Sequence, residues 1–175
     1  MCVIIISVHN FLENLKLNIF YLHESPTTAA EYMCNKHVVK MILESAQLLC
    51  TAHHTCPTNA ERPEKFYKKT HVNHPSAIWA RTSKDNYLWL TAHANALLSE
   101  YTHRYEKQHA STSVIDWCST NIPNIPDLGF TDMPQCMPDE YKSKDSVVAY
   151  RRYYNGAKSH LHNWKRRQVP DWIIE

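Results

Sequence analysis

The feature that most constrains this chain is a pair of long stretches in which apolar residues recur at helical spacing. The first is expected over residues 26–53, where Ser25 and Pro26 resemble a helix start and the apolar residues return at intervals of three and four. These residues are Val38, Val39, Ile42, Ala46 and Leu49. Such a stripe is typical of a helix with one face in a core, so we expect that face to be buried.

The second stretch follows His74, where Pro75 suits a first helical turn and Ser83 is expected to restart the helix. From Tyr87 the helical spacing continues for about 20 residues. Its apolar and aromatic members are Leu90, Ala94, Leu97, Tyr101 and Tyr105. We expect this second long amphipathic helix to pack against the first.

Shorter elements are expected on either side of these helices. A short helix is predicted near residues 114–118 and a final one over residues 145–162. Prolines interrupt residues 123–138, which are expected to form a long ordered loop or a lid. Residues 3–7 and 18–22 are rich in β-branched or aromatic side chains, and each could form a short strand.

Composition favours one mainly α domain. The chain has 175 residues, of which 43% are hydrophobic and only 2 are glycine, so neither disorder nor a turn-rich all-β fold is favoured. We expect a single-domain helical bundle over residues 1–175. Within it, residues 1–17 are an N-terminal extension, residues 18–109 a helical core with the candidate site, and residues 110–175 a Pro-rich loop, a basic-aromatic helix and a tail.

Charge and cysteine usage restrict partners and compartment only broadly. The net charge of +2 does not decide for or against a nucleic-acid partner. No signal for secretion accompanies the six cysteines, so we interpret them as thiols. The apolar run at residues 3–8 is far shorter than the ~20 residues that span a bilayer. We therefore expect an intracellular monomer or dimer without a membrane partner.

The first predicted helix also has a polar face with the same spacing of three and four. Its members are His37, Lys40, Glu44, Gln47, Thr51 and His54. One interpretation is a solvated face on which Lys40 and Glu44 form a helix-stabilising ion pair. The other is a catalytic site, because an acid, a base and a candidate nucleophile lie one turn apart. On that interpretation His37, Lys40 and Glu44 are catalytic candidates.

A second polar cluster precedes the helix expected at Pro75. Its members are Lys68, Lys69, Thr70, His71, Asn73 and His74, followed by Trp79 and Arg81. Because N–H groups at a helix start attract anions, the cluster suits a phosphate group. The alternative is a loop whose histidines only cap a helix. We take His74 as a catalytic candidate and expect the cluster to face the polar stripe across one cleft. The candidate nucleic-acid contacts here are His71, Asn73, Trp79 and Arg81.

A metal site is a further alternative. Cys34 with His37, and His71 with His74, each have the three-residue spacing of metal ligands. No carboxylate is obviously placed with them, and our main interpretation requires no metal or other cofactor.

The C-terminal part combines basic and aromatic residues. Between Ser146 and Pro170 there are six Lys or Arg and no Asp or Glu. Interleaved with tyrosines and Trp164, they suit a phosphate backbone with stacked bases, although a solubilising helix with a tyrosine core face explains them equally well. The candidate DNA contacts are Arg151, Arg152, Lys165, Arg166 and Arg167.

Four strings of this chain resemble a family of bacteriophage and large-virus proteins without assigned function. They are NIFYL at residues 18–22, CNKHVVKMILE at 34–44, THVNHPSAIW at 70–79 and QCMPDEYK at 135–142. The likeness covers about residues 18–172. The family commonly begins near Asn18 and has Asp at the position of Asn35, whereas here 17 residues precede Asn18.

More distantly, the helix with Lys40 and Glu44, followed by His74 and Trp79, is similar to pyrimidine dimer DNA glycosylases of the phage endonuclease V type. That resemblance implies a helical DNA-repair enzyme in which an amine attacks the sugar carbon while a glutamate assists. In those enzymes the amine belongs to the mature N-terminus. Here removal of Met1 would leave that amine on Cys2, which aligns with no motif. Lys36 or Lys40 is therefore the expected substitute for the amine, and Glu44 is the expected carboxylate.

These observations predict a DNA-acting viral enzyme in the host cytoplasm, either a base-excising DNA glycosylase and lyase or a related base-modifying activity. Such enzymes take the target base out of the stack. Two alternatives stay open. One is a non-catalytic nucleic-acid-binding or virion-associated protein, and the other is a metal-dependent enzyme that uses Cys34, His37, His71 and His74.

Overall fold

The computed structural model describes residues 17–174, and these residues form helices joined by irregular segments without any strand. The α-helices are α2 (Pro26–Tyr32), α3 (Asn35–Thr55), α4 (Pro75–Ala80), α5 (Lys84–Tyr105), α6 (Thr112–Thr120) and α7 (Ser146–Asn155). Two 3₁₀ turns follow the Pro-rich segment and α7, η1 (Asp139–Tyr141) and η2 (Ser159–Leu161). The predicted mainly α fold is confirmed, whereas the strand expected at residues 3–7 lies outside the described residues.

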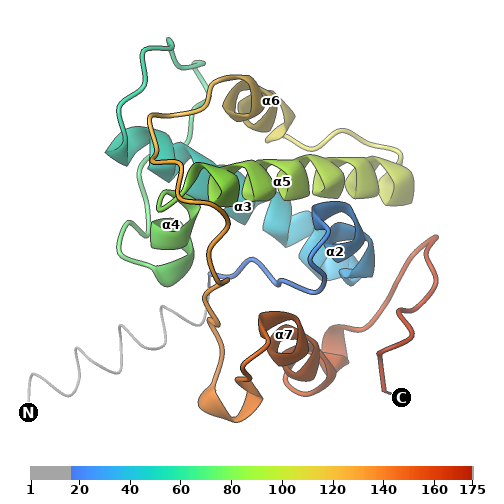
Figure 1. Ribbon diagram of the computed structural model, residues 1–175. Helices are drawn as coiled ribbons and strands as arrows, with labels where there is room; N and C mark the ends of the chain where they lie inside the picture. Colours follow the sequence, from blue (N-terminus) through green and yellow to red (C-terminus); the bar gives the residue numbers. More distant parts are fainter. Residues whose placement is uncertain (1–16, 175) are drawn as a thin grey trace, which may run out of the picture.

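The two long helices pack side by side, as their apolar stripes predict. Helix α5 contacts both α2 and α3, and α6 closes over α3 and α5 (Figure 1). Ile42 and Leu49 of α3 and Leu90 and Leu97 of α5 are all fully buried. Val39 is the exception, with 40% exposure, because it lies about 100° around the helix from Val38 and falls outside the stripe.

The first predicted helix is in fact two helices, since the chain is extended at Met33 and Cys34. Its start is as expected: Ser25 Oγ accepts the N–H of Thr28 at 3.4 Å. The break is held by Arg104 of α5, which is fully buried and donates to the carbonyl oxygen of Met33 at 2.8 Å. Because α5 satisfies this backbone group, α2 can end without leaving it unpaired.

Helix α7 also ends earlier than the sequence predicts, at Asn155 rather than near His162. Gly156 follows, and a Cβ atom there would lie only 2.6 Å from the ring of Tyr141. The chain therefore turns beside Tyr141 and forms the short turn η2. The Pro-rich residues 123–138 contain no helix, as expected, and they connect α6 to η1 along the ends of α4 and α5 (Figure 1).

The segment before α2 runs between the α3–α5 layer and α7 (Figure 1). Residues 18–22 are not a strand, because no other described strand exists to pair with them. Arg151 of α7 donates to the carbonyl oxygen of Leu22 at 3.0 Å, and the Asn18 side chain donates to that of Cys136 at 2.7 Å. These contacts tie the segment to α7 and to the Pro-rich residues 123–138.

Two expectations about the chain's chemistry can be compared with the structure. The described cysteines, from Cys34 to Cys136, are all free thiols. Among the described helices, none combines the length and apolar character that crossing a membrane requires.

Candidate active site

Glu44 lies on the polar face of α3, yet only 7% of it is exposed. Two nitrogens hold its carboxylate. Lys40 Nζ lies 2.9 Å from Oε1, and the backbone N–H of Asn18 donates to Oε2 at 3.2 Å. Burial raises the pKa of Glu44 above its ordinary value, against the opposing effects of Lys40, the Asn18 N–H and His71. Glu44 is therefore suited to exchange a proton at a moderate pH.

Asn18 reaches Glu44 because its own side chain fixes the local backbone. Its Oδ1 accepts the N–H groups of Ile19 at 2.9 Å and Phe20 at 3.2 Å, a turn that asparagine commonly forms. Phe20 then has φ of 56°, a left-handed conformation that is uncommon outside glycine. Sequence analysis missed Asn18 as a site residue, although it opens the NIFYL string at the point where the resembling family begins.

The second polar cluster lies against the polar face of α3. Thr51 Oγ1 donates to the carbonyl oxygen of Thr70 at 3.0 Å and accepts its N–H at 3.2 Å. This contact carries the exposed His71 close enough to Glu44 to affect its pKa. His71 is a second residue with positive φ, at 49°. Asn73, which follows it, is exposed.

The residues that start α4 mainly support the fold. His74 is buried and caps the helix, since its Nδ1 accepts the N–H of Ser76 at 3.1 Å. Trp79 is 4% exposed, and its Nε1 donates to the carbonyl oxygen of Thr131 at 3.1 Å. Its indole is a core group here and has no free face on which a base could stack. Arg81 is half-buried at the end of α4.

His37 is enclosed by aromatic rings. Its ring stacks on Phe20 with 4.2 Å between centroids, and its Nδ1 hydrogen-bonds the hydroxyl of Tyr154 at 2.7 Å. Burial, with nearby positive charge from Lys158 and Lys40, lowers the pKa of His37 to about 3. His37 is therefore neutral near pH 7 and holds Phe20, which in turn positions the segment that begins at Asn18.

Residues 17–113 match the family described as pyrimidine dimer DNA glycosylase. The match covers more than half of the chain and contains Asn18, Lys40, Glu44 and the His71–His74 cluster. The chain belongs to this family. No curated protein and no solved structure matches it.

Family membership identifies a DNA glycosylase-type enzyme whose substrate is DNA. The expectation of an enzyme that acts on DNA is thereby confirmed, together with the distant resemblance from which it came. In this glycosylase the matched region includes Glu44 together with Asn18 and Lys40, each of which contacts its carboxylate.

Several of the C-terminal cations are paired within the glycosylase. Arg167 Nη2 lies 2.5 Å from Glu100 Oε1, and Arg166 Nη1 lies 2.7 Å from Glu106 Oε1. Lys165 stands over the ring of Tyr105. The acidic partners that sequence analysis could not find lie on α5 and just beyond its end, so these cations fasten the tail to α5.

The two arginines of α7 differ from each other. Arg151 donates to Leu22 and lies over the ring of Trp172, 5.1 Å from its centroid. Arg152 is exposed. Lys165, Arg166 and Arg167 are exposed as well, but each of them contacts a residue of α5 or the glutamate that follows it.

Two basic residues that sequence analysis did not assign to the site lie near His37. Lys158 and His160 are near enough to His37 to lower its pKa, and Lys158 stands 4.9 Å from the ring centroid of Tyr153. They follow α7, so only the folding of the chain's last third onto α3 brings them near Lys40. The charges of Lys158 and Lys40 make the potential around His37 positive, which favours an anionic substrate.

The metal alternative finds no support among residues 17–174, where no three His, Cys, Asp or Glu side chains are placed to hold an ion. The physical reason is that its proposed ligands have other contacts. His37 Nδ1 hydrogen-bonds Tyr154, His74 Nδ1 caps α4, and His71 Nδ1 hydrogen-bonds the hydroxyl of Thr70 at 2.8 Å.

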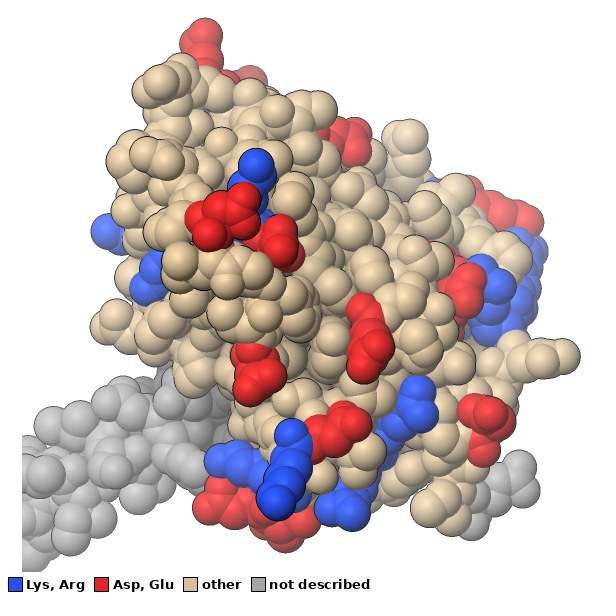
Figure 2. All heavy atoms as spheres, viewed as in Figure 1, with Lys and Arg blue, Asp and Glu red and all other residues tan. Residues whose placement is uncertain are grey.

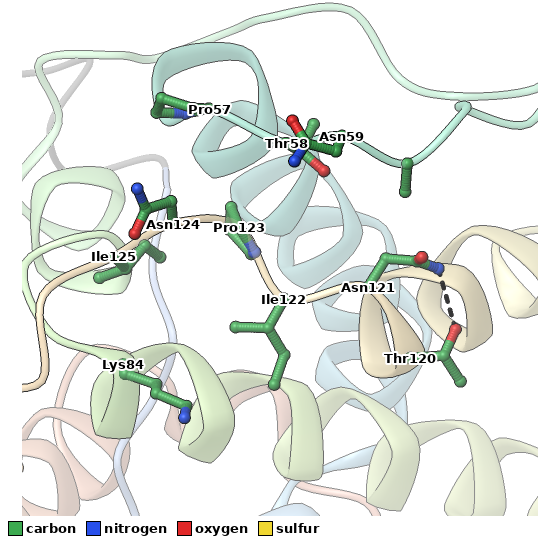
Figure 3. A pocket seen from close by; sticks show the side chains of 11 residues that line it. Pro57, Thr58, Asn59, Lys84, Thr120, Asn121, Ile122, Pro123, Asn124 and Ile125 are labelled. Carbon is green, nitrogen blue, oxygen red and sulfur yellow. Dashed lines mark hydrogen bonds between the residues drawn. The ribbon is translucent and has the colours of Figure 1, made fainter.

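A cavity of about 640 Å³ lies apart from these residues, between the loop after α3, the end of α6 and the start of α5. Figure 3 shows the amides of Asn59, Asn121 and Asn124 around it, with Asn121 bonded to the Thr120 hydroxyl. Neither Glu44 nor its neighbours line this cavity. We therefore place the candidate active site at Glu44.

Proposed function

We propose that this protein is a base-excising DNA glycosylase with lyase activity, in which Glu44 is the assisting carboxylate. The observation that carries the proposal is the contact between a buried carboxylate and two nitrogens, Lys40 Nζ and Asn18 N, in a chain of a glycosylase family. An amine and a carboxylate in contact are the groups that imine chemistry at a sugar carbon requires.

The proposed reaction balances with these two groups. A neutral amine forms a bond to C1′ of the damaged nucleotide, and the bond from C1′ to the base breaks as the base leaves with a proton. Protonated Glu44 donates its proton to the ring oxygen as the sugar opens to an imine. The ionised carboxylate then stabilises the iminium and accepts the C2′ proton, and elimination expels the 3′ phosphate.

The candidate nitrogens differ in their ability to act as the nucleophile. Lys40 Nζ is engaged in the ion pair with Glu44, 2.9 Å from Oε1. Lys36, the other amine expected from the sequence, is exposed. Asn18 N is an amide in the 175-residue chain. In a chain that begins at Asn18, the same atom is an α-amine with an ordinary pKa of about 7.7–8.0.

We therefore propose that a form beginning at Asn18 is the active glycosylase and that its α-amine is the nucleophile. The contact from Asn18 N to Glu44 supports this choice, as does the start of the family match at residue 17. Lys40 is then the cation that balances the charge of Glu44, and it is the alternative nucleophile.

Borohydride trapping tests the proposal, because it reduces an imine to a stable protein–DNA cross-link. DNA with a pyrimidine dimer or an abasic site is incubated with two chains, residues 1–175 and residues 18–175, the second released by a protease that leaves no added residue. We expect a cross-link with the shorter chain only. Mass spectrometry should locate it at residue 18.

Substitution of the carboxylate separates chemistry from binding. Glu44→Gln in the shorter chain should lower trapping by about 100-fold or more, while DNA binding is retained. Glu61→Gln, at an exposed glutamate of a loop, is the matched control and should behave as wild type. A cross-link at Lys40 would assign the nucleophile to lysine. Absence of any cross-link, with DNA binding retained, would favour the non-catalytic binding protein.

A further inference from the structure

A second cavity, of about 590 Å³, lies between the segment before α2, the middle of α5, residues 130–133 and the start of α7. Neither Glu44, Lys40 nor Asn18 lines it. Its volume is within the range of small-molecule sites. It is built from two kinds of group, aromatic rings and carboxylates.

Three aromatic rings form its wall. The ring centroid of Tyr21 lies 5.1 Å from that of Trp89 and 6.2 Å from that of Phe130. Trp89 is held in place, because its Nε1 donates to the carbonyl oxygen of Glu24 at 2.7 Å and its ring stacks on His93. Phe130 is 45% exposed, which is unusual for so large an apolar ring.

Carboxylates surround these rings. Glu24, Asp132 and Asp145 line the cavity, against one cation, Lys144, so its lining carries a formal charge of −2 from three acids and one base. Asp145 is fixed because its Oδ1 accepts the N–H of Val148 at 3.1 Å and caps α7. The pKa of Tyr21 is raised by burial and by the charges of Glu24 and Asp145. Figure 2 shows acidic side chains on the face between α5 and α7.

This combination excludes one ligand class and selects another. Phosphate oxygens would be repelled by three carboxylates, so the cavity is not part of a DNA-binding surface. The faces of aromatic rings attract cations, and carboxylates add charge pairing. We propose that this cavity binds an organic cation, an alkylammonium or guanidinium group, against the aromatic wall that Tyr21, Trp89 and Phe130 form. The site is separate from the glycosylase activity and does not depend on it.

Calorimetric titration of the 175-residue protein at low salt tests the proposal with two probes, 1,4-diaminobutane and N-acetylarginine amide. The first stands for a free polyamine and the second for a basic side chain of a protein partner. We expect saturable binding of at least one probe at 1:1, with a dissociation constant on the order of 1 mM or tighter. The probe that binds more tightly identifies the source of the cation.

Two variants locate the site. Glu24→Gln with Asp132→Asn should weaken binding by about tenfold or more, because two of the three carboxylates lose their charge. Phe130→Leu should weaken it by a smaller factor, since it removes a π face but keeps apolar volume. The matched control is Glu61→Gln with Asp116→Asn, which makes the same charge change at exposed residues outside the cavity.

Either of two results would overturn the proposal. One is absence of binding for both probes at 10 millimolar, about ten times the expected dissociation constant. The other is equal weakening in the cavity variant and the control, which would mean that only net charge attracts the probes. Circular dichroism and thermal unfolding verify that each variant is folded. Borohydride trapping by the chain of residues 18–175 should be the same with and without the cavity substitutions, so this test and that of the glycosylase can fail independently.

Discussion

Two opposing effects act on the pKa of Glu44. Its burial favours the protonated form, while Lys40 and the Asn18 N–H favour the carboxylate, and burial has the larger effect. A carboxyl group whose pKa is raised in the folded state lowers stability when it ionises. Glu44, the residue that we propose for proton transfer, should therefore lower the free energy of unfolding at neutral pH.

A stability measurement with Glu44→Gln checks this trade-off. The native state binds more protons than the unfolded chain from about pH 4.3, the ordinary glutamate value, up to the raised pKa of Glu44. Wild-type stability should therefore fall as pH rises through that window, while the variant lacks this contribution. Urea unfolding from pH 4 to 8 should show the variant gaining on wild type as pH rises. A constant difference would show that Glu44 has an ordinary pKa.

The junction between α2 and α3 depends on a contact from a third helix. Arg104 of α5 is fully buried, pairs with Glu100 at 2.9 Å and donates to the carbonyl oxygens of Met33 and Glu31. Burial alone would raise the pKa of Glu100, but Arg167 and Arg104 hold it below its usual value. One guanidinium thus satisfies both a carboxylate and the end of a helix.

Removal of this guanidinium should be among the most destabilising single changes. Arg104→Leu leaves two buried carbonyl groups without their partner and Glu100 with Arg167 alone, so we expect a loss of about 3–5 kcal/mol in the free energy of unfolding. The exposed Arg152→Leu is the control and should stay within about 0.5 kcal/mol of wild type. Chemical denaturation of both variants gives the comparison. A loss below about 1 kcal/mol for Arg104→Leu would contradict the role of this contact.

At the scale of the whole molecule, three buried histidines make the fold sensitive to acid. Burial lowers the pKa of His53 and His93 to about 4 and that of His37 to about 3. They lie in different parts of the structure: His37 packs against α7, His53 hydrogen-bonds Tyr87 of α5, and His93 hydrogen-bonds the carbonyl oxygen of Pro26. Protonation of any one places a charge in the core.

Stability should consequently fall as pH decreases below about 6.5. In the unfolded chain histidine takes up its proton near pH 6.5, whereas these three resist protonation until pH 3–4 in the fold. Each should cost about 2 kcal/mol at pH 5, so together they approach the 5–15 kcal/mol that stabilises a typical domain. Urea unfolding at pH 7.5 and pH 5 measures the difference. The exposed His160→Gln should leave it unchanged, and equal stability at both pH values would disprove the account.

Most of the helical fold could be predicted from the sequence. Apolar spacing located the bodies of α3, α5 and α6, and Ser25, Pro75 and Ser83 marked helix starts correctly. These are local signals, because helix propensity, capping and periodicity act within a few residues. The errors at Met33 and Gly156 have tertiary causes, a buried Arg104 in one case and the ring of Tyr141 in the other. Neither partner is close in sequence.

For the site, the sequence by itself determined the chemical inventory: it placed Lys40 and Glu44 one turn apart on one helix and identified the resemblance to glycosylases that the family match confirmed. Only the tertiary structure decided which groups meet. It set Asn18 N against a carboxylate 26 positions away and paired Arg167 with Glu100 across 67 positions. Contacts of such separation depend on how helices pack, and packing is a property of the whole chain rather than of any local pattern.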